Sequence, residues 1–172
     1  MIHLTHFLLA LAALFLVGVV AAQDYFYPPL RTETISQGLN GPNHVWLDAA
    51  CVLVGVALVL AASGPWQLAF AGLTLVGLLG ICVTNTAWRW VDGLTGRLGG
   101  HESVHLVFTA LVFVGALLFE LAANDRRLSL WLLTTAGVGV PLVLYELEKR
   151  TDIIEKAAVA LLCAWLVAWS LA

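Results

Sequence analysis

Charged residues are scarce in this chain. Only 11% of its 172 residues are Asp, Glu, Lys or Arg, whereas 61% are hydrophobic. A soluble domain carries roughly 25% charged residues, most of them on its surface. This chain therefore cannot cover itself with polar groups in water, and we expect an integral membrane protein of the cell membrane.

Two residue patterns that would indicate particular ligands are also missing. The eight Lys and Arg do not cluster, and with eleven Asp and Glu they give a formal net charge of -3. A nucleic acid or an anionic headgroup would call for a basic cluster, so neither is predicted as a partner. The three cysteines lie inside apolar runs without CxxC spacing, at Cys51, Cys82 and Cys163. Such cysteines behave as small hydrophobes and indicate no metal site.

Long apolar runs, by contrast, fill most of the chain. A helix needs about 20 mostly apolar residues to cross a hydrocarbon core of about 30 Å. Six segments approach that length: Leu4 to Ala22, Val45 to Ser63, Trp66 to Ala87, Val104 to Ala123, Leu128 to Tyr145 and Ile154 to Leu171. The fifth is the weakest, because Thr, Gly and Pro141 interrupt it. The sequence predicts one all-α domain over residues 1–172, a bundle of six transmembrane helices, with five spans as the alternative.

The residues inside the spans indicate packing rather than transport. Glu120, Asp48 and Lys156 each lie within about a turn of a span end, so no span has a charge near its middle. A pump or channel is therefore disfavoured. Small residues recur, as in GLTLVGLLG of the third span. Helices in lipid associate by close packing at such residues, and we expect these contacts within the bundle rather than with a partner subunit.

The connections divide the polar residues unequally between two membrane faces. One face has only the short hairpin links SGP and ANDRR. The other receives the long segments QDYFYPPLRTETISQGLNGPNH, WRWVDGLTGRLGGHES and ELEKRTD. These segments contain side chains typical of an interfacial, lipid-contacting belt: Tyr25, Tyr27, Trp88, Arg89 and Trp90. We expect any functional site on this long-loop face.

Two signals disagree about the compartment that the long-loop face meets. Most Lys and Arg lie on this face, which the positive-inside bias places in the cytoplasm. The first residues, MIHLTHFLLALAALFLVGVVAAQ, resemble a secretory signal, which would instead place the N-terminus inside. No Lys or Arg precedes their apolar run. We therefore interpret them as a retained first span and expect the long-loop face in the cytoplasm.

A pattern typical of zinc hydrolases begins the fourth span. The stretch GGHESVHLVF contains His101, Glu102 and His105 in HExxH spacing. Residues four apart share a helix face, so both histidines can bind one ion, with the glutamate as general base on a metal-bound water. His44 and Asp48 have the same spacing at the start of the second span. If the two helices are neighbours, His44, Asp48, His101 and His105 can bind zinc or another divalent metal.

The same residues also have a purely structural interpretation. Histidine and acidic residues are ordinary at a helix start near the headgroups, where the helix dipole favours anionic Glu102 and Asp48 beside neutral imidazoles. On the same face, Glu146, Glu148 and Asp152 are further possible ligands or bases. A haem or quinone site is less favoured, because two histidines on one helix end cannot sandwich a haem. We expect no cofactor, with a zinc or other divalent metal site as the alternative.

Several short motifs resemble a known family. The segment YPPLRTETISQGLNGPNHVWLDAACVLVGVAL has a proline and leucine before TIS, a Gly/Pro/Asn loop, and a span that begins with Trp or Leu and a polar residue. A histidine, His105, enters the fourth span, and a charged turn precedes the last. In these features the chain resembles the six-span prokaryotic membrane proteins of domain of unknown function family nine-nine-eight. The resemblance implies a six-helix bundle without an established activity, cofactor or catalytic residue, and it requires neither a full HExxH nor His44.

The sequence favours a small multi-pass membrane protein without catalytic chemistry of its own. Minimal loops on one face, no domain for soluble substrates and small-residue helix faces are typical of an accessory or scaffolding subunit of a larger membrane complex, or of a lipid-binding module. The predicted partners are membrane lipids and other integral membrane subunits. The alternative is a metal-dependent membrane hydrolase that acts on a lipid or peptide at the interface.

Overall fold

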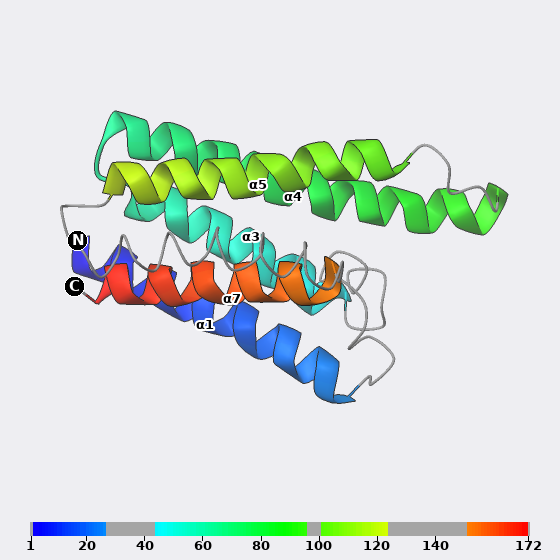
Figure 1. Cartoon of the computed structure of the whole chain (residues 1–172), viewed down its shortest axis with the longest axis horizontal. Coiled ribbons are helices and arrows are strands. Elements are labelled where there is room, and N and C mark those ends of the chain that lie inside the picture. The colour runs from blue at the N-terminus through cyan, green and yellow to red at the C-terminus, as the bar shows by residue number, and fades with distance from the viewer. Residues whose placement is uncertain (1, 27–43, 96–100, 124–150, 172) are drawn as a thin grey trace.

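The regular structure of this chain is helical wherever the computed structural model describes it, at residues 2–26, 44–95, 101–123 and 151–171. Five helices cover these residues: α1 (Ile2–Phe26), α3 (His44–Ala61), α4 (Pro65–Thr95), α5 (His101–Ala123) and α7 (Thr151–Ser170). Figure 1 shows them as an elongated bundle with both chain termini at one end. The all-α prediction is confirmed for the described residues.

Three of these helices are long and apolar enough to cross a membrane. The qualifying segments are Leu4–Phe26, His44–Ala61 and Pro65–Thr84, and a shorter apolar helix covers Val107–Ala123. The bounds of each segment agree with those of an expected span to within about four residues. They agree because the same apolar runs form the helices and determine the hydropathy from which the spans were predicted. The fifth expected span, residues 128–145, lies outside the described residues. A helical, membrane-compatible chain is therefore confirmed, and the count of six spans stays a prediction.

Helix α4 is longer than its apolar run. The prediction that this helix ends at Ala87 and gives way to a loop is wrong, because the helix continues to Thr95. Its 31 residues span about 46 Å, which exceeds the hydrocarbon core of about 30 Å. No proline stops the helix between Trp88 and Thr95. The loss of hydropathy marks where the chain leaves hydrocarbon, whereas backbone hydrogen bonding continues into the polar residues.

A tight link joins α3 to α4, as the sequence predicts. The carbonyl of Gly64 accepts the first helical hydrogen bond, from the Leu68 amide at 2.9 Å. Pro65 occupies the first helical position, where its missing N–H costs nothing. Gln67 then reaches back, and its Oε1 accepts hydrogen bonds from the backbone N–H and the hydroxyl of Ser63, both at 2.8 Å. This cap fixes the start of α4. We call this end of the bundle, which also carries both chain termini, the short-loop end.

The helices pack in the order α7, α1, α3, α4, α5, and each adjacent pair in this order is in extensive contact. Side chains from all five described helices meet in one core, whose largest fully buried members are Trp165, Phe119, Leu9, Leu47, Leu58 and Leu166. At the short-loop end, rings of α5 and α7 also meet, with Phe119 and Trp169 centroids 5.4 Å apart. This contact joins α7 and α5, the first and last helices in the packing order.

Glycines allow α4 and α5 to approach each other at backbone distance. A Cβ at Gly77 would lie 2.8 Å from the nitrogen of Val112. One at Gly115 would lie 2.8 Å from the nitrogen of Thr74. A Cβ at Gly72, by contrast, would meet nothing within 4 Å. The expectation that small residues form contacts within the bundle is thus confirmed for Gly77 and Gly115.

Candidate functional site

The two histidine pairs predicted to bind metal lie at the starts of α3 and α5. Helix α5 begins at His101, so the backbone of His101, Glu102 and His105 forms its first two turns, as expected. Their side chains lie outside the described residues. Helix α3 begins at His44, and because α4 runs back between them, α3 and α5 start at the same end of the bundle (Figure 1). The shared membrane face that the sequence predicts is consistent with this course of the chain.

In the described part of the chain, α3 and α5 pack mainly on α4 rather than on each other. Both pack against α4, and they are not among the described helix pairs in extensive contact. Asp48 lies on the α4 side, where its backbone carbonyl accepts a long contact from the Cys82 thiol at 4.0 Å. Among the described side chains, no three His, Cys, Asp or Glu groups lie close enough to hold a metal ion. The four-residue site of His44, Asp48, His101 and His105 therefore stays a prediction.

The described interfacial residues lie in the last turn of α1 and in the polar extension of α4. Tyr25 is exposed in the last turn of α1, and its ring packs edge-on against Phe26 with centroids 5.1 Å apart. The backbone of Trp88, Arg89 and Trp90 belongs to the extension of α4, and their side chains lie outside the described residues. The side chain of Asp152 also lies outside the described residues. The same is true of the whole of Tyr27, Glu146 and Glu148. An aromatic residue at the end of an apolar helix fits the headgroup level of a membrane.

An ion pair that the sequence analysis did not predict joins the first and last helices. Lys156 of α7 donates hydrogen bonds to both carboxylate oxygens of Asp24 in α1, at 2.8 and 3.0 Å. The two side chains are 20% and 31% exposed, so water screens the pair only in part. The order of the predicted spans could have indicated this pair. In a chain with an even number of spans, the end of the first span and the start of the last span lie on the same membrane face, where opposite charges can meet.

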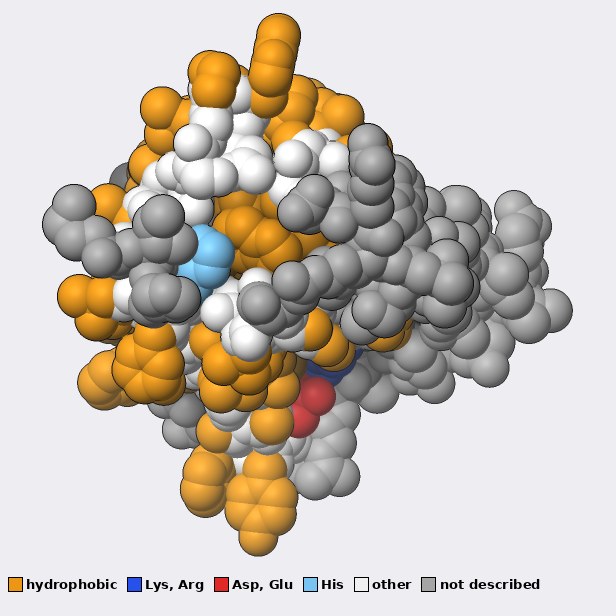
Figure 2. All heavy atoms as spheres, turned by 90° about the vertical axis from the view of Figure 1, so that its left-hand side faces the viewer, with side chains coloured by type: hydrophobic (Ala, Val, Ile, Leu, Met, Phe, Trp, Pro, Cys, Tyr) orange, Lys and Arg blue, Asp and Glu red, His pale blue; other side chains and the backbone are white. Residues whose placement is uncertain are grey.

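An aromatic cluster lies at the short-loop end. Trp165 and Trp169 of α7 stack nearly parallel, with centroids 5.8 Å apart, and Phe119 of α5 meets both rings edge-on. His6 of α1 packs against Trp169 at 4.5 Å, and Figure 2 shows a histidine among hydrophobic side chains at this end. Glu120, which follows Phe119, is buried with an exposed fraction of 6%. The cluster ties three helices together.

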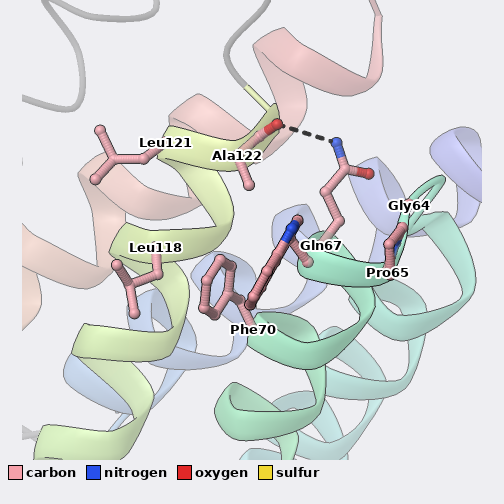
Figure 3. A pocket seen from close by; sticks show the side chains of 8 residues that line it. Gly64, Pro65, Gln67, Phe70, Leu118, Leu121 and Ala122 are labelled. Atoms are coloured by element: carbon pink, nitrogen blue, oxygen red, sulfur yellow. Dashed lines mark hydrogen bonds between the residues drawn. The ribbon is translucent and has the colours of Figure 1, made fainter.

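A groove opens between the start of α4 and the end of α5, also at the short-loop end (Figure 3). Its volume is about 460 Å³, and its walls are mainly apolar. The Gln67 side chain crosses from α4 toward α5, where its Nε2 donates to the backbone carbonyl of Ala122 at 3.4 Å. This groove was not predicted from the sequence, because a site was expected only on the long-loop face.

In comparisons with known proteins, no family model, no curated protein and no solved structure matches this chain. The likeness to domain of unknown function family nine-nine-eight therefore stays a prediction that depends on the short motifs quoted above. The function must be inferred from the residues and contacts of the chain itself.

Proposed function

We propose that this protein is a multi-pass membrane protein of six spans that acts, without catalytic chemistry of its own, as an accessory or scaffolding subunit of a larger membrane complex. The observation that carries this proposal is the use of polar side chains in the described helices. Some of them join neighbouring helices, as expected of a protein whose role depends on its shape and its surface.

Two polar contacts of the described residues join different pairs of helices. The Lys156–Asp24 ion pair joins α7 to α1, and the Gln67–Ala122 hydrogen bond joins α4 to α5. Other hydroxyls bond within their own helix, as when Thr74 Oγ1 donates to the Phe70 carbonyl at 3.0 Å. Polar contacts between helices fix the positions of the helices relative to each other. They make the bundle a defined scaffold.

The outward face of α1 is the surface that a partner subunit would meet. Large apolar side chains recur there at intervals of three and four residues, and they are exposed in the bundle: Leu4, Phe7, Leu8, Leu11, Leu14 and Phe15. The opposite face, with Leu9 and Ala13 fully buried, packs into the core. In a bilayer the outward face contacts lipid or a partner helix. Integral membrane subunits and lipids are therefore the proposed partners.

A photoreactive amino acid at Leu11 tests this proposal. Leu11 is 47% exposed, whereas Leu9 on the opposite face is fully buried and serves as the matched control. In native membranes, we expect Leu11 to form a crosslink to one integral membrane protein of defined mass, and Leu9 to react only within the chain. Adducts of lipid alone at Leu11 would argue against a partner on this face.

A metal-dependent membrane hydrolase is the second candidate. The observation that favours it is the start of α5 at His101, which places the HExxH pattern on a continuous helix. Zinc analysis of the purified protein, with His101→Ala and His105→Ala as comparisons, tests it. One zinc per chain that is lost in both variants would support the hydrolase, and substoichiometric metal that stays unchanged in them would rule it out.

A further inference from the structure

The groove between α4 and α5 has an apolar floor and a polar rim. Phe70 of α4 and Leu118 and Leu121 of α5 line it (Figure 3). Gln67 and Ala122 close the rim with their hydrogen bond. The volume of about 460 Å³ lies within the range of about 300–1,000 Å³ of pockets that hold small molecules. A ligand that fits it must be apolar along most of its length and polar at one end.

The position of the groove along the helices indicates its depth in a bilayer. It begins at the first residues of the apolar segment Pro65–Thr84 and reaches the next-to-last residue of α5. The rim residue Trp66 is 71% exposed and stacks on Phe70, with ring centroids 6.1 Å apart. Tryptophan prefers the level where hydrocarbon meets the headgroups. The polar rim therefore lies at that level, and the apolar floor points toward the hydrocarbon.

The Gln67 amide has hydrogen-bonding capacity that faces the groove. Its oxygen is occupied by the N–H and hydroxyl of Ser63, so its nitrogen is the end directed at α5. The bond from Nε2 to the Ala122 carbonyl is 3.4 Å long, beyond the usual range of about 2.7–3.2 Å. The amide nitrogen carries a second N–H, and the described residues offer it no other acceptor. At the level where hydrocarbon meets the headgroups, a lipid ester carbonyl is an acceptor within reach of this N–H.

We propose that the groove holds one acyl chain of a glycerolipid, and that Gln67 donates a hydrogen bond to the ester carbonyl at the head of that chain. The inference depends on the proposed placement of the chain in a membrane. The apolar floor matches the methylene chain. The ester oxygen is the acceptor that a bilayer presents between its headgroups and its hydrocarbon, at the level of Trp66 and Gln67.

The test compares two lipids that differ only in this oxygen. The full-length protein is reconstituted in nanodiscs of phosphatidylcholine with either two ester-linked oleoyl chains or two ether-linked chains of the same length. Lipid that stays bound after gentle release from the disc is counted by native mass spectrometry. One net hydrogen bond corresponds to about a fivefold preference, so we expect about fivefold better retention of one ester lipid per chain.

Two substitutions and their controls locate the site. Gln67→Leu should make ester and ether lipids bind equally, whereas Thr84→Val, whose hydroxyl bonds within α4 at 2.7 Å, should keep the preference. Because Gln67 also caps α4, Leu118→Trp provides an independent test by filling the groove. It should abolish retention of both lipids, whereas Val114→Trp, one turn away on an exposed part of α5, should not.

Equal retention of ester and ether lipids by the unmodified protein overturns the proposal, and so does a Leu118→Trp variant that retains lipid as well as Val114→Trp. Extraction of membranes with alkaline carbonate separates this failure from a failure of the membrane placement. A chain that stays in the membrane pellet but shows no lipid preference refutes only the groove site. A chain released into the supernatant refutes both.

Discussion

A pair of glycine-to-alanine substitutions on α4 tests how closely the helices pack. At Gly77, an added Cβ would lie 2.8 Å from the backbone nitrogen of Val112 and 2.9 Å from the carbonyl oxygen of Phe108. Both are backbone atoms of α5, so they cannot rotate away as a side chain can. At Gly72, five residues earlier on the same helix, the added Cβ would meet nothing within 4 Å. The two substitutions therefore add the same methyl group to the same helix in different surroundings.

The expected magnitude follows from two opposing effects. Alanine is about 1 kcal/mol more favourable than glycine within a helix, and this gain applies at both positions. An extra methyl group in a filled contact costs typically about 1–3 kcal/mol, because backbones must move apart. We therefore expect Gly72→Ala to be neutral or slightly stabilising. Gly77→Ala should have a free energy of unfolding lower than that of Gly72→Ala by about 1–3 kcal/mol.

The assay is unfolding of the purified protein in mixed micelles by increasing fractions of a denaturing detergent, followed by helical circular dichroism. Comparing the two variants with each other cancels the helix-propensity gain that they share. If Gly77→Ala unfolds within about 0.5 kcal/mol of Gly72→Ala, the scatter of ordinary surface substitutions, the close approach of α4 and α5 does not exist and the packing described above is wrong.

The other predictions concern the ion pair and the aromatic cluster. In a double-mutant cycle with Asp24→Asn and Lys156→Met, we expect a coupling of about 1–2 kcal/mol in unfolding free energy, between the values of exposed and buried pairs; a coupling near zero at low salt would show that the pair contributes nothing. Trp165→Ala should cost about 3–5 kcal/mol because the ring is fully buried, whereas Trp66→Ala, at a ring that is 71% exposed, should cost far less by the same unfolding measurement. Equal losses in the two tryptophan variants would contradict the placement of the cluster.

The sequence predicted which segments are helical better than where the helices end. An apolar run long enough to cross a bilayer must satisfy its own backbone hydrogen bonds, so Val45 to Ser63 had to form a helix much like the observed α3. The end of α4 was missed because hydropathy reports the solvent of the side chains and not the backbone. Residues after Ala87 are polar enough to leave hydrocarbon and still continue the helix to Thr95.

Contacts between helices depend on helix order and rotation, which one sequence does not specify. Gly72 and Gly77 look alike in GLTLVGLLG, yet only Gly77 faces the α5 backbone. The Asp24–Lys156 pair is 132 positions apart in sequence. His44, Asp48, His101 and His105 were predicted to bind one metal ion if their helices are neighbours. A shared membrane face does not by itself put α3 and α5 in extensive contact when both pack on α4.

The central claim is that this bundle works as a subunit of a membrane complex, and the most direct test is the mass of the native particle. The protein is extracted with its surrounding bilayer by a membrane-solubilising polymer, without detergent, and the protein components of each particle are weighed. The account predicts particles in which the 18.5 kDa chain is accompanied by at least one other integral membrane protein in fixed ratio. Particles that contain a single copy of the chain and lipid alone would contradict it.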